Sequence, residues 1–265
     1  MPLTAIQKRV ADILKPFRTD SHYVAGGAAL NRRWQRVSDD LDIWGDAPGL
    51  PKLVEAEIAA LRQAGFTVEI EIEDNYIVEV IVSDGADETR IEWAHSPNTQ
   101  ARFFPAQADE DLGFRIHDLD NAVNKVLAAS RRRNAPRDIV DLVSILDHIG
   151  PLGPLVWAAT GLPGEDRSAT EIIRDIRAIA NTYTREQYQT IRMDGENTVD
   201  RTALIQKIER ALNHAADYCE DEAPIGHPGC LFLDRDGNLL AASERDLDKT
   251  SIVRVQDFQA TPLLR

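Results

Sequence analysis

The sequence predicts an α+β fold: a mixed sheet with flanking helices, then a helical region and a small β-containing tail. Helical and strand-like patterns alternate through residues 1–117, apolar side chains recur at helical spacing through 118–219, and strand-like patterns return in 220–265. We therefore expect an α/β core, a helical region and a tail with these boundaries. The first part of the helical region, 118–150, is expected to complete the functional site.

The core begins with the predicted order helix, strand, helix, strand, helix. Apolar residues at helical spacing predict a helix within 3–17. A short apolar run then leads into Gly26-Gly27, a basic helix and a second strand. Residues 51–64 begin with proline and end before a glycine, as helices commonly do.

Three β-rich runs complete the core. In the first run Val68, Ile70 and Ile72 alternate with glutamates, and this period of two is typical of a strand with one buried and one wet face. The runs YIVEVIVSD and TRIEWAHS predict the next two strands.

The helical region and the tail follow. We expect helices at 118–133, 136–149 and 200–218, and a capping box at 168–171 in front of a further helix. The tail carries a hairpin signal at 236–237, where Asp-Gly separates two apolar runs.

The composition excludes several classes of protein. Of the 265 residues, 43% are apolar and 28% are charged, which excludes a disordered or fibrous chain. Two cysteines are too few for a disulfide framework, and no apolar run reaches the length of about 18 residues that spans a membrane. The first residues lack the pattern of a signal peptide. We therefore expect a cytoplasmic protein without a membrane partner.

The net charge of −14 is unevenly distributed. Residues 67–122 carry 3 basic and 14 acidic side chains, whereas residues 123–140 carry 5 basic and 1 acidic side chain. The overall charge argues against broad, nonspecific binding of nucleic acid. The basic stretch beside the acidic one still fits local binding of phosphates.

The most informative motif is Gly26-Gly27 followed, after twelve residues, by Asp40-Leu41-Asp42. Residues two apart in a strand point to the same face, so the two aspartates present their carboxylates side by side. Hard oxygen ligands of this kind suit Mg²⁺, which also relieves their mutual repulsion. Glycines without side chains let the backbone approach the phosphates of a nucleotide closely.

A glycine pair followed by an aspartate–hydrophobic–aspartate motif resembles the polymerase β-like nucleotidyltransferases. More closely, GGAALNRRW, RVSDDLDIW, RIEW with RFFP, and IHDLDNAVNKVLAASRRRNAPRDIVDLVSI resemble the AbiEii/AbiGii toxin family. That family is the nucleotidyltransferase half of type IV toxin–antitoxin systems. The resemblance covers roughly residues 20–150 and implies the nucleotidyltransferase fold.

The resemblance implies a role for each matching residue. Gly26 and Gly27 would hold the nucleotide phosphates, and Asp40 and Asp42 would be catalytic and bind Mg²⁺ or Mn²⁺. The remaining matches imply catalytic roles for Lys125 and Asp138 and nucleotide-binding roles for Arg36, Ser38, Arg137 and Asp141.

The third metal-binding carboxylate has two candidates. Glu92, in RIEW, matches the third acidic strand residue of the family, where the family commonly has Asp. Glu79, in YIVEVIV, also lies in an apolar strand. We favour Glu92 because Trp93 and the RFFP run beside it match the family as well. The chain departs from the family at Ala28, where many members carry a hydroxyl side chain.

The implied function is a magnesium-dependent nucleotidyltransferase that moves a nucleoside monophosphate from a nucleoside triphosphate to an acceptor hydroxyl. The resemblance further implies the toxin component of a type IV (abortive-infection) system, with tRNA as a candidate acceptor and a cognate antitoxin as a candidate partner. Two alternatives remain open from the sequence: transfer to a protein or a small molecule, and a non-catalytic interaction protein that retains the fold.

Overall fold

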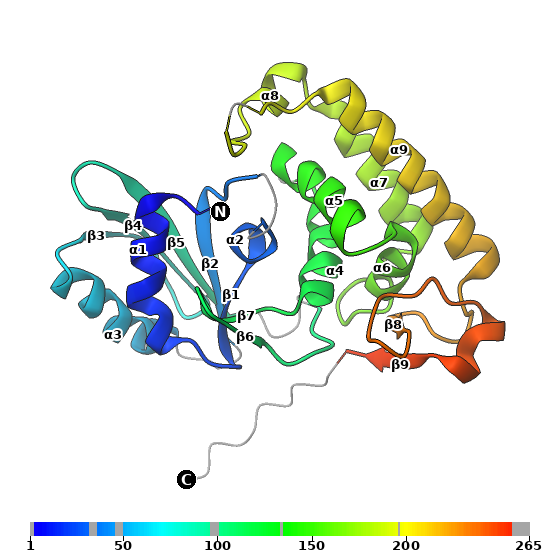
Figure 1. Cartoon of the computed structure of the whole chain (residues 1–265), viewed down its shortest axis with the longest axis horizontal. Helices are drawn as coiled ribbons and strands as arrows, with labels where there is room; N and C mark the ends of the chain where they lie inside the picture. The colour runs from blue at the N-terminus through cyan, green and yellow to red at the C-terminus, as the bar shows by residue number, and fades with distance from the viewer. Residues whose placement is uncertain are drawn as a thin grey trace, which may run out of the picture. The chain divides into compact units, whose positions relative to one another are not determined.

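The structure of the chain is a computed structural model that describes residues 3–31, 36–45, 50–95, 101–132, 135–195 and 197–255. The chain forms two compact units (Figure 1). The described residues of the first unit are those of 3–95 and 105–117, and those of the second are 101–104 and 118–255. The chain therefore visits the second unit briefly before it completes the first.

The first unit is built on one mixed sheet, with seven strands among the described residues. The strand order is β3-β4-β5-β2-β1-β7-β6. The strands are β1 (His22–Ala25), β2 (Asp40–Gly45), β3 (Thr67–Glu73), β4 (Ile77–Ser83), β5 (Glu88–His95), β6 (Gln107–Asp109) and β7 (Gly113–Arg115). Strand β2 lies parallel to β5 and antiparallel to β1, so it occupies the middle of the sheet.

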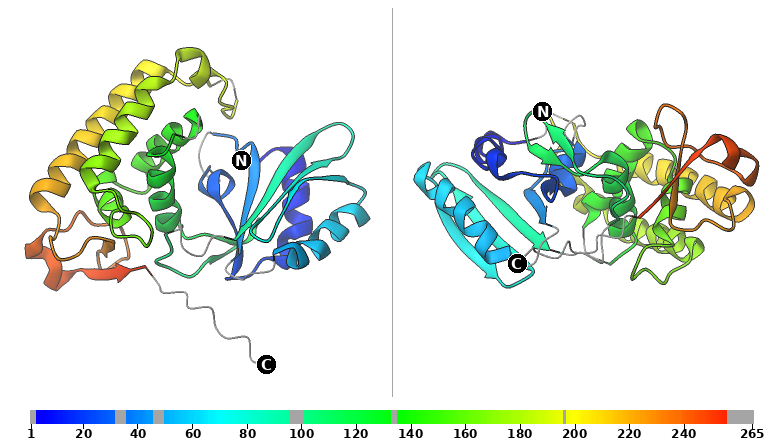
Figure 2. Two further views of the ribbon diagram at one scale, coloured as in Figure 1. Left: turned by 180° about the vertical axis from the view of Figure 1, so that it is seen from behind. Right: turned by 90° about the horizontal axis from the view of Figure 1, so that it is seen from below.

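Helices cover one face of this sheet (Figures 1 and 2). They are α1 (Ala5–Leu14), which continues into the 3-10 turn η1 (Lys15–Phe17), and α3 (Leu50–Gln63). Their apolar stripes pack on the buried side of the strands, where Val80, Ile91 and Trp93 are fully enclosed. The short helix α2 (Gly26–Leu30) follows β1 directly and packs on β1 and β2. The predicted order of elements through β5 is confirmed, but α2 begins at the glycine pair and ends before the arginines; the part of the predicted basic helix at 32–35 lies outside the described residues.

The predicted alternation along the first β-rich run is wrong at one point. A register shift lies between Ile70 and Ile72 in the pairing of β3 with β4, so that Ile70 pairs with Val80 on the buried face and Ile72 with Glu79 on the opposite face. An extra residue in a strand reverses the faces of all residues beyond it. Ile70 and Ile72 are 41% and 43% exposed because β3 is an edge strand.

Two short strands were not predicted from the sequence. Strands β6 and β7 pair antiparallel with each other, and β7 also pairs parallel with β1 at Val24 and Arg115. Each has three residues, too few to show an alternating pattern. They extend the sheet beyond β1.

The second unit is mainly helical, as predicted. Its helices are α4 (Asp118–Ala129), α5 (Pro136–His148), α6 (Leu152–Ala159), α7 (Ala169–Thr182), α8 (Arg185–Gln189) and α9 (Arg201–Asp217). The capping box is confirmed, since the Ser168 hydroxyl accepts from the Glu171 N–H and the Glu171 carboxylate accepts from the Ser168 N–H. In the part of the chain that the structure describes, no helix is both long and apolar enough to cross a membrane.

The tail belongs to this unit but pairs differently from the prediction. A π-helical turn, η3 (Tyr218–Glu222), precedes β8 (Cys230–Leu233), and a 3-10 helix, η4 (Glu244–Lys249), precedes β9 (Ser251–Arg254). The turn at 236–237 forms, and the returning chain pairs briefly with β8 through the bridge between Leu233 and Leu239 and a hydrogen bond of 2.8 Å from the Leu240 N–H to the Phe232 carbonyl. The strand partner of β8 is β9, antiparallel and further along the chain. The predicted hairpin therefore forms, but its second strand is limited to this short pairing around the turn, and β9 provides the longer pairing of β8.

Candidate functional site

The glycine pair lies where β1 passes into α2. Gly26 has a φ of +62°, in the left-handed region that glycine adopts without a steric penalty. A methyl group built on its α-carbon would overlap the Oδ2 atom of Asp42. A glycine at position 26 therefore both allows the left-handed turn and leaves room for the Asp42 carboxylate.

Gly27 meets a second pair of predicted residues. A methyl group there would overlap the Arg36 guanidinium and would lie 2.7 Å from the Ser38 hydroxyl. Arg36 and Ser38 are almost completely buried, and Arg36 donates a hydrogen bond of 3.1 Å to the Val37 carbonyl. Arg36 thus packs beneath the glycine turn, so its guanidinium supports the turn directly.

Ser38 connects the turn with the first aspartate. Its hydroxyl lies 3.2 Å from Asp40 Oδ1, to which it donates a hydrogen bond. A buried donor of this kind restricts the rotamer of the carboxylate that it contacts. The residues predicted from the motif, from Gly26 to Asp42, are therefore in contact within the first unit.

The register of β2 and β5 places a third carboxylate beside the two aspartates. Asp42 is the in-register partner of Glu92, and Asp40 is the partner of Arg90. Residues paired across neighbouring strands lie about 4.8 Å apart and point to the same face. Asp40, Asp42 and Glu92 are each partly exposed on the face opposite α1 and α3.

Glu79 points to the same face of the sheet as Glu92 but lies on β4, one strand further from Asp42. Its partner in the antiparallel pairing of β4 with β5 is Glu92. Arg90 Nη1 lies 2.6 Å from Glu79 Oε1, and Arg90 Nη2 lies 3.2 Å from Glu71 Oε2. The charge of Glu79 is thus offset by Arg90, whereas Glu92 is the nearer of the two to Asp42.

The donor set fits a hard divalent cation in its chemistry. Asp40, Asp42 and Glu92 offer only carboxylate oxygens, the ligands that Mg²⁺ prefers. Among the described residues, no three His, Cys, Asp or Glu side chains already stand in an arrangement that could hold a metal ion. The support for metal binding therefore comes from donor type and strand register.

The second unit brings together the remaining acidic and basic candidates. Lys125 Nζ on α4 lies 2.7 Å from Asp141 Oδ2 and 3.8 Å from Asp138 Oδ1 on α5. Asp138 and Asp141 are three residues apart and share one face of the helix, which begins at Pro136. All three charged side chains are buried. Arg137, between them in sequence, is half-buried at the first turn.

Sequence reasoning missed a buried polar network under the helical face of the first sheet. The Glu57 carboxylate accepts a hydrogen bond of 2.9 Å from Trp93 Nε1 and forms an ion pair with Arg18. His22 Nδ1 lies 3.3 Å from Glu57 Oε1. Burial, reinforced by the charge of Arg18, lowers the pKa of His22 to about 3, so the imidazole is neutral at pH 7 and this contact is no ion pair.

The second unit has a comparable anchor for residues 101–104. Asp120 accepts hydrogen bonds of 3.0 and 3.2 Å from the N–H groups of Phe103 and Phe104. The Asn124 side chain bonds both the N–H and the carbonyl of Ala101. Burial raises the pKa of Asp120 to about 7, although the two N–H donors oppose this shift. The RFFP run that resembled the family is thus fixed to α4.

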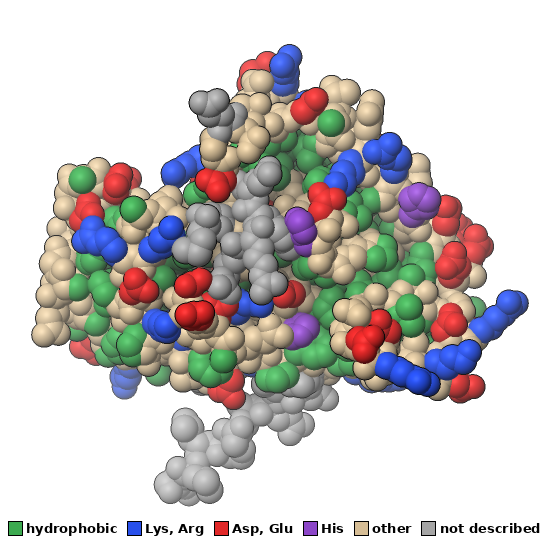
Figure 3. All heavy atoms as spheres, viewed as in Figure 1, with side chains coloured by type: hydrophobic (Ala, Val, Ile, Leu, Met, Phe, Trp, Pro, Cys, Tyr) green, Lys and Arg blue, Asp and Glu red, His purple; other side chains and the backbone are tan. Residues whose placement is uncertain are grey.

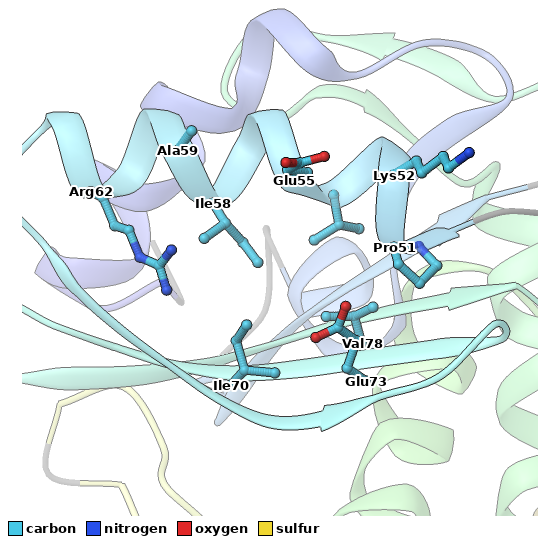
Figure 4. Close-up of a pocket in the computed structure, with 10 residues that line it drawn as sticks. Pro51, Lys52, Glu55, Ile58, Ala59, Arg62, Ile70, Glu73 and Val78 are labelled. Atoms are coloured by element: carbon cyan, nitrogen blue, oxygen red, sulfur yellow. The ribbon is translucent and has the colours of Figure 1, made fainter.

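A groove of about 510 Å³ lies between α3 and strands β3 and β4, on the helix-covered face of the first sheet. Figure 4 shows Ile58 and Arg62 of α3 pointing toward Ile70 of β3 across it. Arg62 closes one end by donating to the Val68 carbonyl at 3.2 Å. None of the residues predicted for the site lines this groove.

Charges of both signs are interspersed on the molecular face drawn in Figure 3. Many basic side chains of the second unit are paired with acids: Arg167 with Glu165 at 2.7 Å, and Arg177 with Glu209 at 2.8 Å. These ion pairs place opposite charges next to each other and so reduce the local net charge of the second unit.

The fold is shared with two structures from Helicobacter pylori. One, JHP933, has a TM-score of 0.55 at 12% identity and covers 81% of this chain and 91% of its own. The other, described as a candidate nucleotidyltransferase, has a TM-score of 0.51 at 13% identity and covers 81% of this chain and 94% of its own. No family model and no curated protein sequence matches the chain. The predicted fold class, a mixed sheet with flanking helices followed by a helical region and a small β-containing tail, is confirmed, and the two Helicobacter pylori structures share this fold.

Proposed function

We propose that the protein is a magnesium-dependent nucleotidyltransferase that uses a nucleoside triphosphate as donor. The observation that carries the proposal is the contact of Gly26 with the carboxylate of Asp42, whose partner on the neighbouring strand is Glu92. A glycine turn against an acidic strand offers backbone to phosphates and oxygen ligands to Mg²⁺ or Mn²⁺ at one place.

The first unit supplies the donor side of the proposed site. Gly26 and Gly27 would face the phosphates, and Asp40, Asp42 and Glu92 would hold the metal, as the strand register and the glycine contacts allow. A bound divalent cation stabilises the charge that develops on the phosphoryl oxygens. Arg36 and Ser38 support the nucleotide indirectly, since both are buried behind Gly27.

The proposed reaction is an in-line displacement at the α-phosphorus. The acceptor oxygen forms a bond to this phosphorus, and the bond to the bridging oxygen breaks. Pyrophosphate leaves with the electron pair of that bond, and the acceptor proton passes to a carboxylate or to solvent.

Roles are also proposed for four residues of the second unit. Lys125 and Asp138 are proposed as catalytic, and Arg137 and Asp141 as nucleotide-binding. Support comes from the cluster that Lys125 forms with both aspartates, because a buried ammonium held by carboxylates has a fixed position.

The motifs of residues 20–150 also suggest a biological setting. We propose the toxin component of a type IV toxin–antitoxin system of the AbiEii/AbiGii type, acting in the cytoplasm. Candidate acceptors are tRNA and protein hydroxyls, and a cognate antitoxin is the candidate partner. A neighbouring gene for such an antitoxin would support this setting.

The direct test is transfer of label from nucleoside triphosphates carrying ³²P at the α-position. The purified protein is incubated with each labelled triphosphate, tRNA and Mg²⁺, with and without a chelator. We expect labelled tRNA that depends on Mg²⁺ and is lost in Asp42→Ala. Equal labelling by Asp42→Ala contradicts the proposed mechanism.

A further inference from the structure

Gln7, in the first turn of α1, makes contacts at both ends of its side-chain amide. Its Oε1 accepts a hydrogen bond of 2.9 Å from the Thr4 N–H, which is half of the capping box that begins the helix. Its Nε2 donates a hydrogen bond of 3.0 Å to the carbonyl of Ser38, 31 residues away in sequence. Gln7 is only 1% exposed, so neither bond competes freely with water.

The two partners fix the orientation of this amide. A reversed amide would set a donor against the Thr4 N–H and an acceptor against the Ser38 carbonyl. A capping box alone is satisfied by either glutamate or glutamine. Only glutamine can also donate to Ser38, so the contact with Ser38 accounts for the choice of side chain.

Ser38 touches both halves of the proposed site. Its hydroxyl donates to Asp40 Oδ1 at 3.2 Å, and the same hydroxyl lies against the α-carbon of Gly27. A backbone shift at Ser38 would therefore move the Asp40 carboxylate and open the contact with the glycine turn.

We propose that Gln7 is a positioning residue that fixes the Ser38 backbone and, through the Ser38 hydroxyl, the Asp40 carboxylate. The role of Asp40 as a metal ligand rests on the proposed function, whereas the fixing of Ser38 does not. Partners of ligating carboxylates commonly change metal affinity by about 10 to 100-fold when they are removed.

Three variants separate positioning from helix capping. Gln7→Glu keeps the acceptor for Thr4 but sets a carboxylate oxygen against the Ser38 carbonyl. Thr4→Ala removes the other half of the capping box and leaves the bond from Gln7 to Ser38 in place. Gln7→Met has a similar shape and lacks both polar ends, so it replaces Gln7→Glu if the buried carboxylate prevents folding.

Two measurements on the full chain test the proposal. Hydrogen exchange followed by mass spectrometry reports on the backbone of residues 36–42, and electron paramagnetic resonance reports on binding of Mn²⁺. We expect Gln7→Glu or Gln7→Met to exchange faster over 36–42 and to bind Mn²⁺ about tenfold more weakly. Thr4→Ala should lower only the melting temperature.

The outcomes distinguish the inference from the proposed function. Unchanged exchange over 36–42 in the Gln7 variants overturns the inference, and so does Mn²⁺ affinity equal to that of Thr4→Ala. If the wild-type protein binds no Mn²⁺, the proposed function fails, and the exchange measurement still decides whether Gln7 fixes Ser38.

Discussion

The α-carbon of Gly26 lies directly against the carboxylate of Asp42, with no room for a methyl group between them. Asp42 lies in β2 and pairs with Ala25, the last residue of the antiparallel strand β1. Gly26 directly follows Ala25 and begins α2. The backbone of Gly26 and the carboxylate of Asp42 are therefore in direct contact. A ligand that contacts one of them reaches the other.

Gly26→Ala should disrupt the contact between Gly26 and the Asp42 carboxylate. The substitution adds the strain of a left-handed alanine, about 1–2 kcal/mol, and forces the Asp42 side chain aside. We expect nucleotide binding to fall by more than tenfold, measured by calorimetry with a triphosphate analogue and Mg²⁺.

Gly65→Ala is the matched control for this strain. Gly65 has a φ of +90° and no neighbour within 4 Å of an added methyl group. The free energy of unfolding, measured by urea denaturation, should fall by a similar 1–2 kcal/mol or so in this variant, and nucleotide binding should be retained. Equal nucleotide binding by both variants would show that the contact with Asp42 is irrelevant.

Glu92→Gln and Glu79→Gln should separate the two candidates for the third carboxylate. Glu92 is in register with Asp42, whereas Glu79 is paired with Arg90 at 2.6 Å. We expect Glu92→Gln to lower the rate of label transfer by about 10² to 10³, in the range of a lost electrostatic contribution at a reacting phosphate. Glu79→Gln should stay within a few-fold of wild type, and the reverse order would assign the role to Glu79.

Lys125→Met should destabilise the second unit. It removes the cation that lies 2.7 Å from the buried Asp141 carboxylate. Breaking a buried ion pair from one side typically costs about 3–5 kcal/mol, whereas replacing both partners with apolar side chains costs far less. Chemical denaturation should therefore show that Lys125→Met/Asp141→Leu is more stable than Lys125→Met, and a less stable double variant would refute the pairing.

His22 should make the protein less stable in acid. The pKa of His22 is about 3 in the folded chain against its ordinary value of 6.5, so the unfolded chain takes up a proton first as pH falls. The stability from neutral His22 is complete above pH 6.5 and declines between 6.5 and 3, by about 1.4 kcal/mol per pH unit for one proton. Denaturation at several pH values should show this slope, and His22→Gln should remove from it the contribution of the one proton that His22 takes up on unfolding.

The sequence predicted the parts of the site that depend on local pattern. The glycine turn, the two aspartates on one strand and the helix that carries Asp138 and Asp141 all follow from spacing within a single element. The register that joins Asp42 to Glu92 connects two strands separated by a helix and a hairpin, so no local pattern specifies it.

The remaining differences also come from contacts between distant segments. Gln7 donates to Ser38 across 31 residues, and β8 forms its longer pairing with β9 rather than with the nearer run after Gly237. The capping-box spacing of Thr4 and Gln7 was visible in the sequence, but it indicates only the start of a helix. The bulge between Ile70 and Ile72 left no sign, because the alternation in the sequence continues through it.

The most direct test of the central claim is calorimetric titration of a non-hydrolysable nucleoside triphosphate analogue in the presence of Mg²⁺. Wild type, Asp42→Asn and Asp39→Asn are compared, since Asp39 is an exposed acidic residue just before the strand. We predict binding by wild type and Asp39→Asn that depends on Mg²⁺ and is at least tenfold weaker in Asp42→Asn. Absence of binding by wild type, or equal binding by Asp42→Asn, would contradict a nucleotide site at Gly26 and Asp42.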